Sequence, residues 1–149
     1  MKPKRVILLV DDNDAALSVL KLVLETRGYR VIACSSGEQA IAAFAQGGIE
    51  LVLSDLVLGV PGDGKMDGAE LIRRVKEISP ETRAILFSGS VKSWEFESAA
   101  DVFLPKGQHR PAGLLERIRL LLIRERGPKP KKLSAIGDQQ SARVMEASA

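Results

Sequence analysis

Short apolar runs alternate with amphipathic stretches along the first 125 residues of this chain, and this order constrains its fold more than any other feature. Apolar runs without regular polar alternation are typical of strands that are buried on both faces of a parallel sheet. The five predicted strands are Arg5–Val10, Tyr29–Ala33, Leu51–Leu53, Ala84–Phe87 and Val102–Leu104. The pattern therefore predicts a parallel sheet with a buried interior.

Helical patterns lie between and after these strands. Apolar side chains recur in them at helical spacing, and proline, glycine and capping residues mark their ends. The predicted helices are Asn13–Arg27, Ser36–Gln46, Asp67–Ile78 and Pro111–Arg126, with a further short helix around Val91–Ala100. Five alternating strand–helix units predict an α/β fold with helices on both faces of the sheet and right-handed crossovers.

The size and composition of the chain are those of one globular domain. It has 149 residues, of which 45% are apolar and 28% charged. No apolar run approaches the roughly 20 residues that span a bilayer, so we expect no membrane insertion. The first apolar run ends in Asp11 and Asp12 without a cleavage site, which favours a strand over a signal peptide. Cys34 is the only cysteine, which excludes an internal disulfide and fits the cytoplasmic location that we expect.

The formal net charge of +3 belongs to the C-terminal end of the chain. Residues 126–149 carry five basic and two acidic side chains, so the residues before them are neutral as a group. This end is rich in Pro, Lys, Ser and Ala and has no sustained apolar period, which indicates disorder. We therefore predict a folded domain over residues 1–126 and a basic, disordered tail over residues 127–149. No aromatic residue is interleaved with the basic run, so we expect no specific nucleic-acid binding.

Polar side chains stand where the predicted strands end. Asp11 and Asp12 follow the first strand, Asp55 the third, Ser88 ends the fourth, and Lys106 comes just after the fifth. Because ligands of such sheets bind beyond the carboxyl ends of the strands, we expect these groups to lie together at one edge. Each residue alone is also ordinary turn or capping chemistry. Their common position at successive strand ends favours a functional site.

This combination indicates a magnesium-dependent site that accepts a phosphoryl group. Mg²⁺ prefers oxygen ligands, and Asp11 and Asp12 supply carboxylates for it. Asp55 serves both as a metal ligand and as the nucleophile that forms an aspartyl phosphate. Ser88 donates a hydrogen bond to one phosphoryl oxygen, and Lys106 offsets charge on another. Three carboxylates, one ammonium and one Mg²⁺ sum to zero formal charge, which suits the charge stabilisation that phosphoryl transfer needs.

These residues lie in segments that resemble the receiver domain of bacterial two-component response regulators. The matching segments are VILLVDDN at 6–13, LVLSDLVL at 51–58, MDGAELI at 66–72, AILFSG at 84–89 and DVFLPK at 101–106. The resemblance covers about residues 4–125. It implies the flavodoxin-like (βα)5 fold with a five-stranded parallel sheet in the order 2-1-3-4-5, a fold for which a receiver is a standard illustration.

The resemblance also implies how the site works. Asp55 is the phosphoacceptor and takes its phosphoryl group from a phosphohistidine of a sensor histidine kinase or a histidine phosphotransfer protein. Asp11 and Asp12 match the acidic pair of the family, and the backbone carbonyl of Val57 completes the Mg²⁺ site.

Three further residues match the family's signalling machinery. Ser88 matches the switch hydroxyl, Phe103 the switch aromatic and Lys106 the lysine of the site. Phe103 has no hydroxyl, so it switches by packing alone. The implied output is contact with a downstream protein or onward relay of the phosphoryl group.

Three segments depart from the family pattern. The loop after Asp55 is longer than usual because of residues 59–65 (GVPGDGK), and we expect it to border the site. The stretch from Ser88 to Lys106 is shorter than usual, which predicts a fourth helix that loses about a turn or is irregular. Gly107 follows the lysine where proline is usual.

The long loop also carries two competing patterns. Gly59–Lys65 matches the G-x-x-x-x-G-K of a phosphate-binding P-loop, but Met66 replaces the Ser or Thr that would hold magnesium. A calcium loop that begins at Asp63 would need Glu where Arg74 stands. His109, the only histidine, cannot build a metal triad alone, and we expect it to be exposed.

The sequence thus predicts a stand-alone, Mg²⁺-dependent receiver that is phosphorylated on Asp55 and acts as a signalling protein rather than an enzyme. Two alternatives stay open: an adaptor of the same fold that works without phosphorylation, and a fragment of a larger regulator or hybrid kinase. The initial Met and the unstructured tail favour the stand-alone receiver over the fragment, and we expect the 149 residues to leave no room for an effector domain.

Overall fold

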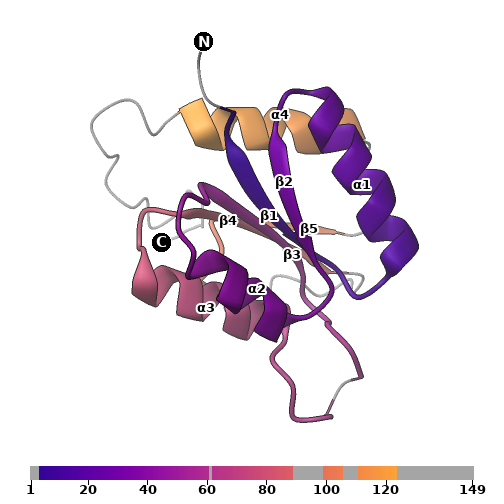
Figure 1. The fold of residues 1–149 in the computed structure, drawn as a ribbon, viewed down its shortest axis with the longest axis vertical. Helices are drawn as coiled ribbons and strands as arrows, with labels where there is room; N and C mark the ends of the chain where they lie inside the picture. The colour runs from indigo at the N-terminus through magenta and orange to yellow at the C-terminus, as the bar shows by residue number, and fades with distance from the viewer. Residues whose placement is uncertain (1–3, 61, 89–98, 106–110, 124–149) are drawn as a thin grey trace. The chain divides into compact units, whose positions relative to one another are not determined.

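A computed structural model describes residues 4–60, 62–88, 99–105 and 111–123. Its centre is a five-stranded parallel sheet with the strand order β2-β1-β3-β4-β5. The strands are β1 (Val6–Val10), β2 (Arg30–Cys34), β3 (Leu51–Asp55), β4 (Arg83–Ser88) and β5 (Val102–Pro105). The predicted fold class and strand order are confirmed (Figure 1).

Four helices are present in the described ranges. They are α1 (Asp14–Thr26), α2 (Gly37–Phe44), α3 (Gly68–Ile78) and α4 (Pro111–Ile123). Side chains at the predicted starts cap three of them, since Asn13, Ser36 and Asp67 each accept a backbone N–H from the first turn of the helix that follows. Gly28, after α1, has a φ of 92°, which allows the chain to leave the helix and enter β2.

The two faces of the sheet bury alternate residues of each strand. Leu8 and Val10 belong to a buried cluster with Phe44 of α2 and Leu71 of α3. Figure 1 shows α2 and α3 side by side on this face and α1 on the opposite one. Ile7 and Leu9 are equally buried and point to the other face, because successive strand residues alternate. All five residues of β3 are buried, as expected for the central strand.

Every strand except β1 ends one or two residues later than the sequence predicted. The prediction ended the third strand at Leu53, but β3 continues through Asp55, whose backbone pairs with Phe87. Asp55 is therefore the last residue of the strand and does not follow it. Apolar periodicity missed this extension because the added residues, Ser54 and Asp55, are polar although buried.

Some predictions fall outside the described residues. These are the tail over 127–149 and most of the helix expected around Val91–Ala100. The chain divides into two compact units, Met1–Ile118 and Arg119–Ala149, and the division falls within α4. The boundary between residues 126 and 127 stays a prediction. Among the described helices, none is long and apolar enough to cross a membrane.

Candidate metal centre

Three carboxylates meet at the carboxyl edge of the sheet. Asp11, Asp12 and Asp55 each place a potential ligand atom within 4.8 Å of the others. Strand register explains the meeting: Val10 of β1 lies beside Ser54 of β3, so the residue after each reaches the edge at the same level. The structure thus brings together the three aspartates that the sequence predicted to share this edge.

The three carboxylates differ in exposure. Asp55 is buried, with only 8% of the residue exposed, whereas Asp11 is half-buried and Asp12 is exposed. Asp11 is fixed at the start of α1, because its Oδ1 accepts the N–H of Asn13 at 2.9 Å. An all-oxygen donor set that opens to water on one side fits Mg²⁺, which binds one or two carboxylates and keeps several waters. A cation would also relieve the repulsion among the crowded carboxylates.

The backbone around Asp55 is tightly held. The Ser54 hydroxyl donates to the carbonyl oxygen of Asp55 at 2.9 Å, and the N–H of Leu56 donates to Phe87 at 2.7 Å. From α3, the N–H of Gly68 donates to the carbonyl of Leu56 at 2.8 Å. A Cβ on Gly68 would stand 2.0 Å from the Asp55 carbonyl oxygen, so only glycine fits there. The first residue of α3 therefore packs directly on the peptide group that carries Asp55.

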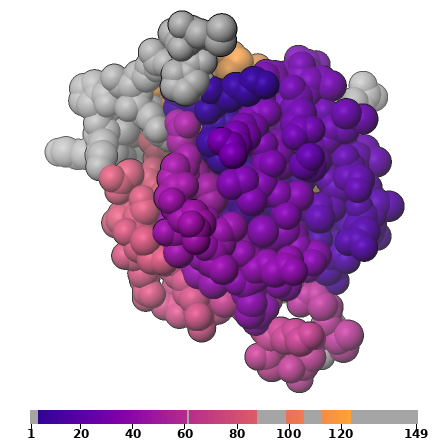
Figure 2. Space-filling view, in the orientation of Figure 1, coloured from indigo at the N-terminus to yellow at the C-terminus, as the bar shows by residue number. Residues whose placement is uncertain are grey.

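The long loop over residues 57–66 connects this edge to α3 and projects from the body of the protein (Figures 1 and 2). It touches the acidic cluster at its beginning, where the N–H of Gly59 donates to Asp12 Oδ2 at 2.8 Å. Gly59 has a φ of 85°, a conformation that favours glycine. The expectation that the long loop borders the site is confirmed by this contact.

Backbone N–H groups of the loop bind a carboxylate of the loop itself. Asp63 accepts the N–H of Val60 at 3.2 Å and that of Lys65 at 2.8 Å. A P-loop offers its N–H groups to phosphate instead. The P-loop interpretation therefore finds no support in these contacts.

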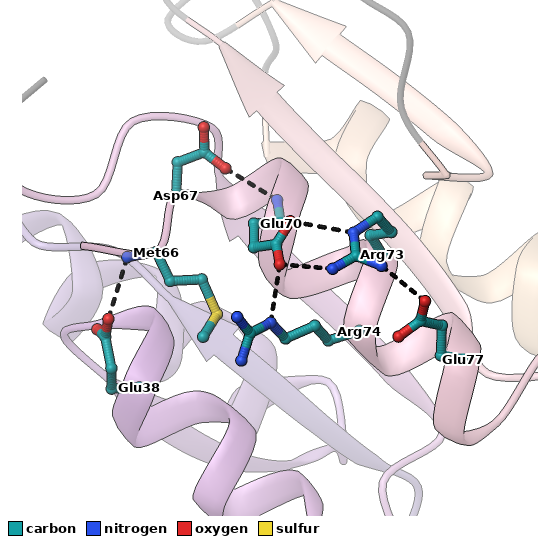
Figure 3. Close-up of polar contacts among 7 residues, drawn as sticks. All are labelled: Glu38, Met66, Asp67, Glu70, Arg73, Arg74 and Glu77. Atoms are coloured by element: carbon teal, nitrogen blue, oxygen red, sulfur yellow. Dashed lines mark hydrogen bonds and ion pairs between the residues drawn. The ribbon is translucent and has the colours of Figure 1, made fainter. Parts of the chain in front are cut away.

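The end of the loop is held by α2. Glu38, in the first turn of α2, accepts the N–H of Met66 through Oε2 at 3.0 Å (Figure 3). This hydrogen bond is the main reason why the pKa of Glu38 lies below its usual value of 4.5. An open groove of about 880 Å³ is lined by both residues and by Arg73 and Arg74 of α3, so solvent reaches the contact.

The outer face of α3 carries a separate charged cluster. Glu70 accepts hydrogen bonds from Arg73 at 2.6 Å and from Arg74 at 2.8 Å, and Glu77 accepts one from Arg73 at 2.6 Å (Figure 3). The two arginines lower the pKa of Glu70 to about 2. Pairs this exposed each contribute little to stability. The cluster is an ordinary solvent-facing ladder of i,i+3 and i,i+4 pairs.

A family model described as the response regulator receiver domain matches residues 7–118 of this chain. The chain belongs to the response regulator receiver family. The match includes the three clustered aspartates and every residue of the sheet except Val6. The resemblance found in the sequence motifs is thereby confirmed, and this receiver is a signalling domain of the two-component type.

Curated relatives share this receiver segment. The uncharacterized transcriptional regulatory protein YkoG of Bacillus subtilis is 32% identical over 143 residues, which are 94% of this chain and 60% of YkoG. The response regulator receiver protein CpdR of Brucella abortus is 35% identical over 86 residues, which are 58% of this chain and 67% of CpdR. The chain thus spans only part of the length of YkoG.

Solved receivers have the same fold. A receiver domain protein from Methanospirillum hungatei superposes with a TM-score of 0.71 at 29% identity, over 83% of this chain and 98% of that one. The response regulator TrrA of Thermotoga maritima, solved in complex with Mg²⁺-BeF, gives a TM-score of 0.70 at 27% identity, over 78% of this chain and 98% of TrrA. Receiver domains bind Mg²⁺ at an acidic pocket, and the cluster in this receiver has the composition of such a pocket.

The other predicted site residues are described unevenly. Val57 comes two residues after the end of β3, and 47% of the residue is exposed. Phe103 of β5 is half-buried and packs against the core cluster beside Leu86, its register partner. The backbone of Ser88 ends β4 opposite Pro105 at the functional edge, but its side chain lies outside the described residues, as do Lys106 and His109.

The structure adds the contacts of four residues to which the sequence motifs assigned no individual role at the site. Ser54, Gly59 and Gly68 contact the aspartates or their backbone, and Glu38 holds the end of the loop. A serine in a buried apolar run was a usable signal for the first of them. Nothing in the sequence marks Glu38, because it meets Met66 across 28 residues of chain.

Proposed function

We propose that this receiver accepts a phosphoryl group on Asp55, with Mg²⁺ held by Asp11, Asp12, Asp55 and the backbone carbonyl of Val57. The observation that carries the proposal is the three-carboxylate cluster at the edge of a receiver sheet. The similarity to TrrA, which was solved with Mg²⁺-BeF, supports the same chemistry here. Bound Mg²⁺ would supply positive charge to the phosphoryl oxygens.

The transfer itself needs little from the protein beyond position and charge. An oxygen of the Asp55 carboxylate attacks the phosphorus of a phosphohistidine, the P–N bond breaks, and the imidazole leaves as the new P–O bond forms. The hydrogen bonds around the Asp55 peptide hold its carboxylate at the edge for this attack. Hydrolysis later returns inorganic phosphate when water attacks the same phosphorus, the P–O bond to Asp55 breaks and the carboxylate is released.

The remaining residues complete the proposed site. Lys106 offsets negative charge on one phosphoryl oxygen, and Ser88 donates to another. Phe103 responds by packing, because its half-buried ring already lies at the border of the core. The end of β4 opposite Pro105, one residue before the lysine, supports a common location for Ser88 and Lys106.

The partners follow from this chemistry. The donor is a sensor histidine kinase or a histidine phosphotransfer protein, which are the partners of receiver domains. The acceptor of the signal is a downstream protein that is contacted directly or that receives the phosphoryl group. We place the reaction in the cytoplasm, and the lone buried Cys34 is compatible with a reducing compartment.

The test is direct phosphorylation. Incubation with Mg²⁺ and acetyl phosphate is expected to add the mass of one phosphoryl group, and Asp55→Asn is expected to abolish the gain. The same mass gain in Asp55→Asn would place the phosphoryl group elsewhere. Absence of modification in the wild-type chain, with beryllofluoride and a cognate kinase also tested, would favour the phosphorylation-independent adaptor.

A further inference from the structure

The long loop is tied to the rest of the chain at its two ends. In its described residues, 57–60 and 62–66, two hydrogen bonds reach other elements. One runs from Gly59 to the carboxylate of Asp12, and the other from Met66 to the carboxylate of Glu38. The first tie belongs to the acidic cluster itself. The second attaches the end of the loop to α2.

The second tie lies a short way along the backbone from the phosphoacceptor. Met66 is followed by Asp67, whose Oδ1 caps α3 by accepting the N–H of Glu70 at 2.8 Å. The next residue, Gly68, lies against the carbonyl of Asp55 and donates to Leu56. Two peptide units thus connect the N–H of Met66, which Glu38 binds, with Gly68, which contacts Asp55.

The first turn of α2 is a firm support for this contact. Ser36 caps the helix by accepting the N–H of Gln39 at 3.1 Å. Gly37 is buried, and a Cβ there would stand 3.0 Å from the Met66 side chain, so loop and helix are in close contact. Glu38 adds a charge-assisted hydrogen bond to this packing, a stronger kind than a neutral one.

We propose that Glu38 is a positioning residue for the acidic site and acts through the N–H of Met66. Its carboxylate fixes the end of the long loop on α2, which keeps Gly68 seated on the Asp55 peptide and Asp55 in register with Asp11 and Asp12. The inference rests on the proposed function, because its consequence is tighter Mg²⁺ binding. A longer loop has more conformations to restrict, so an added tie has a larger effect here than in a short loop.

Two substitutions of Glu38 separate the effect of the hydrogen bond from the effect of the charge. Glu38→Ala removes both the acceptor and the charge. Glu38→Gln removes the charge but keeps a side-chain oxygen that accepts the Met66 N–H. Glu77→Ala is the matched control, because it removes an exposed carboxylate of α3 that contacts Arg73 and not the loop.

The first measurement is the Mg²⁺ dissociation constant by isothermal titration calorimetry, with folding checked by circular dichroism. We expect Glu38→Ala to raise the constant about threefold to tenfold, below the effect of losing a direct partner of a metal ligand. Glu38→Gln and Glu77→Ala should stay within about twofold of wild type. Equal constants for wild type and Glu38→Ala, or equal losses in Glu38→Ala and Glu38→Gln, would overturn the positioning role.

The second measurement is limited trypsin digestion without metal. The bond between Lys65 and Met66 is expected to be cut several-fold faster in Glu38→Ala than in wild type or Glu77→Ala, since the loop end has lost its tie. Unchanged cleavage would overturn the inference while leaving the proposed function intact. A wild-type chain that binds no Mg²⁺ would overturn the proposed function and, with it, the role of Glu38.

Discussion

The starts of α2 and α3 are built from the same parts but have different neighbours. Each has a capping side chain, Ser36 or Asp67, followed by a buried glycine as the first helical residue. Gly37 faces the side chain of Met66, whereas Gly68 faces the backbone carbonyl of Asp55. A side chain can move aside, but the backbone of a central strand cannot. The glycine that begins α2 can therefore be replaced, whereas the glycine that begins α3 cannot.

The largest expected difference comes from alanine at the two glycines. In Gly68→Ala the new Cβ would stand 2.0 Å from the Asp55 carbonyl oxygen, so helix and strand must separate. We expect a loss of about 3 kcal/mol in the free energy of unfolding, at the upper end for overpacking. Urea denaturation followed by circular dichroism measures it. A loss under about 1 kcal/mol would show that α3 can shift at no great cost.

The two capping residues should differ less from each other in their effect on stability than the two glycines do. Asp67→Ala and Ser36→Ala each remove an acceptor for one N–H of the first turn. Each is expected to lower the free energy of unfolding by about 1 kcal/mol. Only Asp67→Ala should also weaken Mg²⁺ binding, because it loosens the residue next to Gly68. Equal Mg²⁺ affinity in both variants would contradict the special role given to the start of α3.

Gly37→Ala should have the smallest effect on stability. The helical preference of alanine over glycine is worth up to about 1 kcal/mol, and displacement of the flexible Met66 side chain offsets part of it. We expect a net change within about 0.5 kcal/mol in the same denaturation experiment. A loss close to that of Gly68→Ala would erase the distinction between the two helix starts.

The final prediction concerns pH. Its readout is an NMR resonance rather than the stability of the whole protein. Hydrogen bonding to Met66 lowers the pKa of Glu38 below 4.5, so the bond is charge-assisted above that pH and weakens to a neutral one as the pH falls through the lowered pKa. The amide resonance of Met66 should report this with a midpoint below 4.5, and the response should vanish in Glu38→Gln. A midpoint at or above 4.5 would mean that the bond is not formed in solution.

The sequence predicted the sheet because its strands are buried on both faces and nearly uninterrupted by polar residues. It predicted the meeting of Asp11, Asp12 and Asp55 because parallel strands share one edge. It could not predict the end of β3, since Ser54 and Asp55 are polar yet buried by their neighbours. Contacts set by tertiary structure, such as that of Gly68 with the Asp55 peptide, were also beyond it, because local pattern does not identify what faces a helix start.

The loop over residues 57–66 supplies part of its own hydrogen bonding, since Asp63 binds two of its backbone N–H groups. A segment that satisfies itself in this way can be shortened, extended or exchanged without leaving the body of the protein with unpaired groups. Gly59 and Met66, which attach the loop to the rest of the chain, then mark the ends of the segment that can be replaced. This loop is therefore where new recognition surfaces can be introduced by selection or by design.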